Sequence, residues 1–255
     1  MKKYLIDFEI VENNRLSELY SMLTLKPLQG ELPEIYPGQF VQVDVPNSKS
    51  TYLRRPISVN YVDYTQNHLW LLVRKAGAGT ASLIEMQKGE KLNLMLPLGN
   101  GFTVFPKESM LLIGGGVGVA PLLYLGKKAK EAGTDVKFLL GARTKADLLE
   151  LEHFQQIGEV FISTENGEMG EKGFVTQHSV LKSGSFSHIA CCGPMPMMKA
   201  VAKIAKELNV ECEVSLENVM ACGLGACLCC VEDTTEGNVC VCKEGPVFNI
   251  DRLKW

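Results

Sequence analysis

Short runs rich in strand-forming residues fill the first hundred positions of the chain. They are separated by residues typical of turns, such as Gly38, Asn67 and Gly89. Spacing of this kind predicts a small antiparallel β-barrel or sandwich. A segment with helical spacing, residues 80–87, precedes the last run and is expected to close one end of the barrel. The six runs are residues 4–13, 19–27, 39–46, 57–64, 68–75 and 91–98.

The pattern changes near residues 97–102. An apolar run that begins at Ser109 ends in glycines, and from there apolar runs alternate with segments of helical spacing. Strands alternating with helices are typical of βαβ units and a parallel sheet. From about Glu211 this pattern gives way to a cysteine-rich tail. The expected strands are 109–116, 136–143, 159–167 and 188–194, and the expected helices are 120–133, 145–158 and 195–209.

The expected fold class is α+β multidomain. An antiparallel β-barrel is expected over residues 1–100, and an α/β domain with a parallel sheet over residues 101–213. Residues 214–255 are expected to form a separate C-terminal loop segment. The 255-residue chain has a net charge of −3, which argues against nucleic-acid binding. Acidic residues interrupt the apolar N-terminus, and the chain lacks any apolar run of about 18 residues, so we expect a cytoplasmic protein.

Six of the nine cysteines lie in the last 34 residues. In a reducing compartment such clustering favours a metal site over disulfides. Cys222, Cys227 and Cys230 follow a C-x4-C-x2-C spacing, and Cys242 follows after eleven intervening residues, a set typical of two-iron clusters. Glycines between the first cysteines would let backbone N–H groups point at the sulfurs. The alternative is zinc held by four thiols, with Cys227-x2-Cys230 and Cys240-x-Cys242 as its ligands.

Two further stretches fit phosphate binding. In residues 113–123, IGGGVGVAPLL, an apolar strand runs into glycines and a helix follows at once, which presents free N–H groups to an anion. Pro121 stands where the G-x-G-x-x-G pattern has its last glycine, so a tight turn without a ligand is the alternative. In the barrel, Arg55 precedes a strand and fits bidentate phosphate binding, and Gly79 and Thr80 begin a helix that offers a second phosphate site. A solvated surface loop is the alternative reading of the arginine.

The order of these motifs resembles the ferredoxin–NADP reductase superfamily of flavoproteins, over nearly the whole chain. The resemblance implies that the barrel binds FAD and that the α/β domain binds a nicotinamide nucleotide. The residues that match the FAD motifs are Arg55, Pro56, Ile57, Ser58, Leu72, Val73, Arg74, Gly79 and Thr80. Those that match the nicotinamide-nucleotide motifs are Gly116, Gly118, Ala120, Pro121, Cys192, Gly193, Pro194 and Met197.

The tail resembles one subfamily, the electron-transfer subunits of dihydroorotate dehydrogenase type B. This resemblance implies a [2Fe-2S] cluster on Cys222, Cys227, Cys230 and Cys242. It also implies an FMN-containing catalytic subunit as partner, two copies of each chain, and electron transfer to NAD⁺ in pyrimidine (UMP) biosynthesis. Cys229 departs from the subfamily, in which we expect glycine, and is interpreted as a bystander.

None of the four histidines stands in a recognisable acid–base or nucleophile constellation. We therefore expect no catalytic residues, and no oxidation of dihydroorotate without the partner. Two alternatives stay open from the residues. One is the same fold serving another partner, as in ferredoxin–NADP transhydrogenase or sulfide dehydrogenase subunits. The other is a zinc-stabilised nucleotide-binding regulator. The choice between NAD and NADP stays open, because Arg143 and Lys145 could each bind the 2′-phosphate of NADP or simply be solvated.

Overall fold

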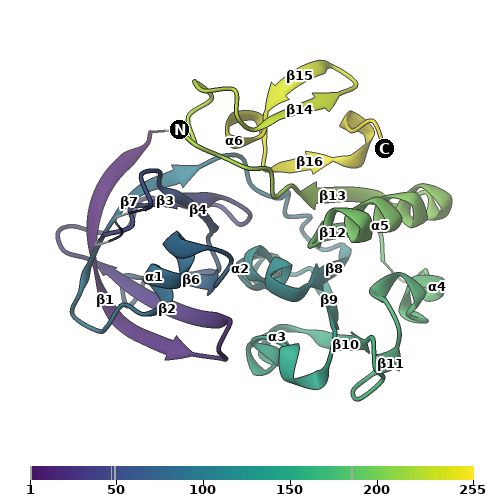
Figure 1. Cartoon of the computed structure of the whole chain (residues 1–255). Coiled ribbons are helices and arrows are strands. Elements are labelled where there is room, and N and C mark those ends of the chain that lie inside the picture. Colours follow the sequence, from purple (N-terminus) through teal and green to yellow (C-terminus); the bar gives the residue numbers. More distant parts are fainter. Residues whose placement is uncertain (1, 47, 49, 185) are drawn as a thin grey trace. The chain divides into compact units, whose positions relative to one another are not determined.

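The computed structural model describes residues 2–46, 48, 50–184 and 186–255 (Figure 1). The chain forms two compact units. The first comprises residues 1–101, 218–232 and 238–246, and the second comprises residues 102–217, 233–237 and 247–255. Most of the cysteine-rich segment therefore belongs to the same unit as the N-terminal strands.

Antiparallel strands build the first unit, in the order β4-β3-β7-β1-β2-β6-β5. They are β1 (Tyr4–Arg15), β2 (Tyr20–Pro27), β3 (Phe40–Val43), β4 (Arg55–Ser58), β5 (Tyr61–Asp63), β6 (His68–Arg74) and β7 (Lys91–Leu98). Inward-facing side chains such as Phe8, Leu23 and Leu71 are fully buried and form the core. The predicted barrel is confirmed.

The barrel closes where one predicted strand, residues 57–64, divides into β4 and β5. The Val59 N–H donates to the Gln39 carbonyl beside β3, whereas the next N–H, of Asn60, donates to the Trp70 carbonyl on β6. The chain thus leaves one strand and joins another within two residues, and β4 contacts β6. Helix α1 (Ala78–Ile84) packs against β6 and β2 with Leu83 and Ile84 buried.

The second unit contains a seven-stranded sheet within the described residues, in the order β11-β10-β9-β8-β12-β13-β16. Its strands are β8 (Ser109–Gly115), β9 (Asp135–Ala142), β10 (Glu159–Thr164), β11 (Glu171–Lys172), β12 (His188–Cys192), β13 (Glu211–Ser215) and β16 (Val247–Asn249). All neighbours are parallel except β13 and β16, which are antiparallel. The predicted α/β domain with a parallel sheet is confirmed.

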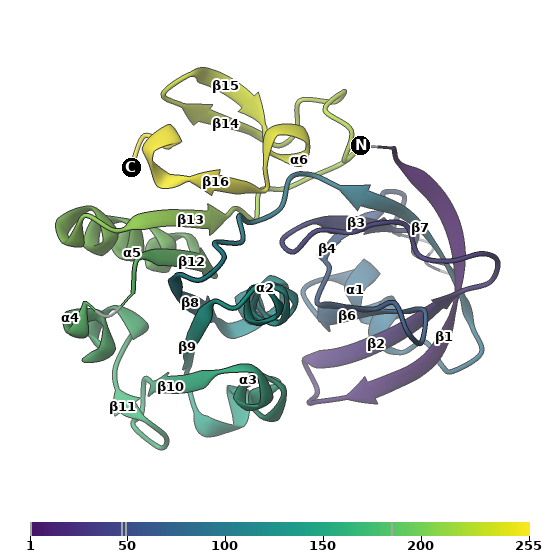
Figure 2. The ribbon, with the colours of Figure 1, turned by 180° about the vertical axis from the view of Figure 1, so that it is seen from behind.

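Helices cover both faces of this sheet. Helices α2 (Ala120–Glu131) and α3 (Leu151–Ile157) lie on one face, and α4 (Val180–Ser183) and α5 (Met195–Leu208) lie on the other, as Figures 1 and 2 show from opposite sides. From β8 the chain first extends the sheet through β9 and later returns to β8's other side as β12. The carboxyl ends of β8 and β12 therefore form the switch point at which open α/β sheets bind ligands.

Two sequence expectations need correction. The strand pattern does not end near Glu211, because β13 and β16 continue the sheet with Val214 and Phe248 buried. These strands are three to five residues long, too short for a periodic pattern to stand out. The helix expected over 145–158 is a 3₁₀ turn (Lys145–Asp147) followed by α3, because Glu150 adopts a left-handed φ of 57° between them.

The rest of the tail forms a hairpin and a short helix. Strands β14 (Val231–Thr234) and β15 (Gly237–Cys240) pair with each other, and α6 (Val241–Glu244) follows. Within the part of the chain that the structure describes, each helix is too short or too polar to cross a membrane.

Candidate functional site

The six cysteines of residues 222–242 are all free thiols in the first unit. Cys230 and Cys242 are buried, Cys222 is half-buried, and Cys227 is exposed. The loop from Cys222 to Cys230 turns sharply because Gly223 and Gly225 adopt left-handed φ angles of 69° and 79°. Left-handed backbone is the conformation that glycine adopts without a steric penalty.

These turns aim backbone N–H groups at sulfur atoms. The Leu224 N–H donates to Cys222 Sγ at 3.3 Å, the Gly225 N–H to Cys242 Sγ at 3.1 Å, and the Cys242 N–H to Cys230 Sγ at 3.4 Å. Burial raises the pKa of Cys222, but N–H groups of the loop outweigh burial and lower that pKa to about 6. Such donors favour the thiolate, the form that ligates iron.

Cys240 lies near the same thiols but in a different environment. Burial and neighbouring thiols raise the pKa of Cys240, as they raise the pKa of Cys242 to about 12, so the pKa does not separate these two thiols. The Cys240 S–H points toward the Gly225 carbonyl at 3.9 Å. A carbonyl oxygen repels a thiolate, so this position suits a ligand less well than those that receive N–H groups. Cys229 has an exposed side chain.

The donor set fits a two-iron cluster. Four thiols, a loop folded by two glycines, and N–H groups aimed at three of the sulfurs are what a [2Fe-2S] cluster requires. Among the described residues no three acidic, histidine or cysteine side chains converge as they would around a single ion. A two-iron cluster takes two thiolates on each iron, so three cysteines need not converge on one ion.

The outer face of the barrel supports this loop. A Cβ placed on Gly223 would lie 2.8 Å from Gln42 Cγ and 3.3 Å from Leu98 Cδ1, so β3 and β7 touch the loop. The side chain of Asn100 donates to the Lys243 and Glu244 carbonyls, at 3.3 and 3.0 Å. The cluster segment and the barrel are therefore fastened together within one unit.

The expected FAD residues gather on neighbouring elements of the barrel. Arg55, Pro56, Ile57 and Ser58 form β4, and all four are half-buried. A Cβ on Gly79 would lie 3.1 Å from Arg55 Nε, so the guanidinium lies against the start of α1. There, Thr80 Oγ1 accepts from the Ala76 and Gly77 N–H groups, at 2.8 and 3.2 Å. The structure thus brings the two expected phosphate sites together.

The three expected FAD residues on β6 differ in exposure. Leu72 and Val73 are buried, at 2% and 0% exposure. As neighbours on a strand they point to opposite faces, Val73 to the core side with Leu71 and Leu72 to the other side. Arg74 is exposed. Of these three, Arg74 alone presents its side chain to solvent.

The expected nicotinamide-nucleotide residues meet at the switch point of the second unit. Gly114 of β8 and Cys192 of β12 stand opposite each other in register. A Cβ on Gly118 would lie 2.4 Å from the Cys192 carbonyl oxygen, and one on Gly115 would lie 2.6 Å from Met197 Sδ. The two loops therefore pack backbone against backbone. The turn from β8 leads into α2, where Ala120 and Pro121 are buried in the first turn, and Gly193 and Pro194 precede α5.

Gly116 stands apart from the other glycines of this turn. Its φ is 56°, and a Cβ there would meet nothing within 4 Å. The backbone next to α2 is thus open at this position, as approach of a phosphate requires.

The loop after β9 carries Arg143 and Lys145, both exposed. The Lys145 N–H donates to the Glu168 carboxylate at 3.1 Å. The loop thus presents two cations and a neighbouring carboxylate, and these charges do not by themselves choose between NAD and NADP.

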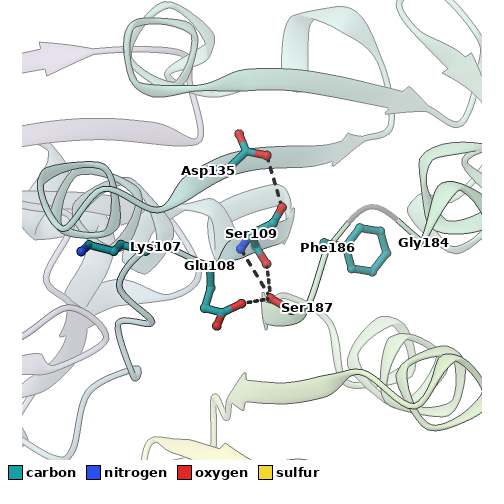
Figure 3. A pocket seen from close by; sticks show the side chains of 7 residues that line it. All are labelled: Lys107, Glu108, Ser109, Asp135, Gly184, Phe186 and Ser187. Atoms are coloured by element: carbon teal, nitrogen blue, oxygen red, sulfur yellow. Dashed lines mark hydrogen bonds between the residues drawn. The ribbon is translucent and has the colours of Figure 1, made fainter.

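A surface hollow of about 500 Å³ lies elsewhere on the second unit (Figure 3). It is at the amino ends of β8 and β9, where Ser187 Oγ donates to Glu108 at 3.0 Å and Ser109 Oγ to Asp135 at 3.3 Å. Its two carboxylates would repel phosphates, and it lies at the end of the strands opposite the glycine turn. We do not assign it to the nucleotide.

Comparison with known proteins identifies the family. Residues 217–254 match the iron-sulfur cluster binding domain of dihydroorotate dehydrogenase B, and residues 112–203 match the oxidoreductase NAD-binding domain. A protein of Caldanaerobacter subterraneus subsp. tengcongensis, named dihydroorotate dehydrogenase B (NAD(+)), electron transfer subunit, is 39% identical over 94% of both chains. The chain belongs to this family. The Clostridium perfringens member is 40% identical over 85% of this chain and 86% of its own.

Several solved structures are also similar to this chain. A chain of an NADH-dependent reduced ferredoxin-NADP oxidoreductase, described for flavin-based electron bifurcation, has a TM-score of 0.85 and 28% identity. The match covers 97% of this chain and 90% of that one. The flavohem-like FAD/NAD binding domain of nitric oxide dioxygenase from Vibrio cholerae has a TM-score of 0.69 at 21% identity, which shows the fold alone. The predicted family and fold class are confirmed.

Proposed function

We propose that this chain is the electron-transfer subunit of a dihydroorotate dehydrogenase of type B. It would pass electrons from a dihydroorotate-oxidising subunit to NAD⁺ through a [2Fe-2S] cluster and FAD, in pyrimidine synthesis. The observation that carries the proposal is the position of β3. This strand pairs with β4, the Arg55–Ser58 strand, and its Gln42 touches the cluster loop at Gly223. The expected flavin and cluster sites are thus one strand apart within one unit.

The predicted FAD and nucleotide residues would each bind one cofactor of this electron path. When bound, FAD would supply the chemistry that links transfer of one hydride, two electrons at once, at the nicotinamide to single-electron exchange with the cluster. Arg55 and the start of α1 would neutralise the FAD pyrophosphate, and Ser58 would hydrogen-bond beside the isoalloxazine ring. The switch-point turns at Gly116 and Gly193 would hold the nicotinamide nucleotide.

The cluster would be held by Cys222, Cys227, Cys230 and Cys242. Backbone N–H groups, two from the loop and one from α6, point at three of these sulfurs, and such groups stabilise thiolates and tune the potential of the cluster. Cys240, whose S–H faces a carbonyl, would remain a neighbour of the cluster.

The partner would dock on the exposed side of the cluster loop. Val219, Leu224 and Leu228 are 78%, 43% and 64% exposed, an apolar rim around the exposed Cys227. Leu228 also holds a left-handed φ of 58°, an unfavourable conformation for a branched side chain. A strained, exposed leucine beside a cluster ligand is typical of a contact site. We assign this rim to an FMN-containing catalytic subunit, in an assembly with two copies of each chain.

Reconstitution with the partner tests the proposal. The purified chain should contain two irons, two sulfides and one FAD, and show the visible absorption of flavin plus cluster. With the catalytic subunit added, dihydroorotate should reduce NAD⁺, and the chain alone should leave dihydroorotate unchanged. Zinc in place of iron, or dihydroorotate oxidation by the chain alone, would refute the proposal.

A second candidate function rests on the similarity to the ferredoxin-NADP oxidoreductase chain. In that case the partner would be a subunit that exchanges electrons with ferredoxin and NADP. Reduced ferredoxin and dihydroorotate, each offered with the respective partner, would separate the two functions by which donor reduces the flavin. A location in the cytoplasm stays a prediction.

A further inference from the structure

Gln42 is a buried amide between the strand expected to bind FAD and the loop expected to bind the cluster. It is the third residue of β3, with no exposed surface, and it stands opposite Pro56 of β4. Within the described residues neither Oε1 nor Nε2 of its side chain has a hydrogen-bond partner.

An unpartnered buried amide is costly. Burying such a group without a partner loses its hydrogen bonds to water without replacement, and the great majority of buried polar groups are paired. An apolar side chain of similar size would avoid this cost at a position that has no exposed surface. The amide is therefore explained best by a partner that the polypeptide does not supply.

The direction of the side chain indicates where this partner lies. A Cβ built on Gly223 would lie 2.8 Å from Gln42 Cγ and 3.0 Å from Nε2. Gly223 follows Cys222 directly, in the loop whose N–H groups already point at sulfurs. The nearer polar atom, Nε2, carries two N–H donors and no protein acceptor.

We propose that Gln42 donates a hydrogen bond from Nε2 to a sulfur of the [2Fe-2S] cluster and thereby raises its reduction potential. The inference rests on the proposed cluster. Donors to sulfur stabilise the reduced cluster, which carries one more negative charge than the oxidised cluster. Gln42 is a positioning residue that sets the cluster's potential from the flavin side of the loop.

Gln39 provides a matched comparison three residues away. It is also buried, at 1% exposure, but its amide is paired: Nε2 donates to the Gly99 carbonyl at 2.8 Å, and Oε1 accepts from the Tyr36 N–H at 2.7 Å. Substitution by methionine at Gln39 therefore removes an amide that is paired within the protein, whereas the same substitution at Gln42 removes an unpaired amide.

The first test is a redox titration of the holoprotein followed by the electron paramagnetic resonance of the reduced cluster. Gln42→Met removes the donors at similar volume and should lower the midpoint potential. A tenfold change in the ratio of oxidised to reduced cluster corresponds to 59 mV for one electron, and we expect a shift of about this size. Gln42→Glu, which replaces donors by acceptor oxygens, should lower the potential further. Gln39→Met should destabilise the fold and leave the potential unchanged.

The second test is made on the wild-type holoprotein and repeated on the two methionine variants. Wild-type holoprotein labelled with ¹⁵N in glutamine side chains should show a ¹⁵N hyperfine coupling to the reduced cluster in pulsed paramagnetic resonance. The coupling should persist in Gln39→Met and vanish in Gln42→Met. This test holds even if a Gln42 variant fails to assemble the cluster, because the labelled wild type then decides.

The outcomes separate this inference from the function it rests on. A wild-type chain without iron would refute the proposed cluster and therefore the proposed function. A wild-type cluster with no glutamine coupling, and with the same potential in Gln42→Met and Gln42→Glu, would refute the role of Gln42 alone.

Discussion

The cluster loop and the nucleotide turn are both rich in glycine, but their glycines serve different purposes. In the cluster loop, Gly225 is needed for its left-handed φ, which turns N–H groups toward sulfurs, and Gly223 combines such a φ with a close approach to Gln42. In the nucleotide turn, Gly118 is needed for space, because a Cβ would lie 2.4 Å from the Cys192 carbonyl oxygen. Gly225 of the cluster loop is required for its backbone conformation, whereas Gly118 of the nucleotide turn is required for the close approach of two backbones.

This difference matters because conformation and space tolerate substitution differently. Asparagine adopts the left-handed region at lower cost than other residues with a side chain, so it replaces a conformational glycine in part. No side chain, however small, relieves a clash with backbone. Four experiments follow in decreasing order of expected effect, and those at Gly118 and Gly225 test this contrast directly.

Removal of a proposed ligand should have the largest effect. Cys227→Ser should abolish the cluster, with complete loss of its visible absorption and paramagnetic signal, because a two-iron cluster needs four thiolates. Cys229→Ser should retain iron, sulfide and signal, since its exposed thiol lies outside the proposed set. Retention of the cluster in Cys227→Ser together with loss in Cys229→Ser would reverse the assignment.

Filling the nucleotide turn should come next. Gly118→Ala places a Cβ against backbone, so we expect a loss of about 3 kcal/mol in stability and more than tenfold weaker NADH binding, measured by flavin reduction. The cluster spectrum should be unchanged, because Gly118 lies in the other unit. Gly118→Asn should do no better. Normal NADH binding by Gly118→Ala would contradict the requirement for space.

Filling the cluster loop should cost less. At Gly225 the three atoms nearest to a Cβ all belong to the Lys243 side chain, the first at 3.2 Å, so the penalty in Gly225→Ala is mainly its φ of 79°. We expect about 1–2 kcal/mol, seen as faster loss of iron to a chelator. Gly225→Asn should recover part of the loss. Equal iron loss in the alanine and asparagine variants would remove the conformational explanation.

Changes at the exposed rim should have the smallest effect on the chain itself. Leu228→Gly relieves a φ of 58° and removes an apolar side chain, so it should stabilise the chain by about 1 kcal/mol. Association with the catalytic subunit should weaken about fivefold to tenfold, measured by surface binding or co-elution. Leu208→Gly on α5 is a control, since Leu208 is also exposed but belongs to the other unit. Unchanged association in Leu228→Gly would place the partner elsewhere.

Long helices and strands and the spacing of nearby residues were predictable from the sequence. Short strands and features that depend on distant partners were not. The barrel strands and helices α2 and α5 follow from apolar runs and helical spacing, because each buries one continuous face. Strands β13 and β16 were missed because their few residues are buried by distant partners. The interruption at Glu150 was also missed, since a single left-handed residue changes no hydrophobic pattern.

The role of Gln42 had no signal in the sequence. It lies in an alternating run, 39–46, where a polar residue predicts a solvent-facing side chain. In the fold that outer face is covered by the cluster loop, and the amide is fully buried. A sequence pattern reports which face of a strand a residue occupies, whereas the covering segment comes from 180 residues further along the chain.

The local order of residues sufficed for the family, the fold class and the candidate cluster cysteines, because spacing within a loop and periodicity within a strand are local properties. The two uses of glycine and the burial of Gln42 required the folded chain. Each of these depends on which backbone group or side chain arrives from a distant segment, and long-range contacts of that kind are established only when the chain packs.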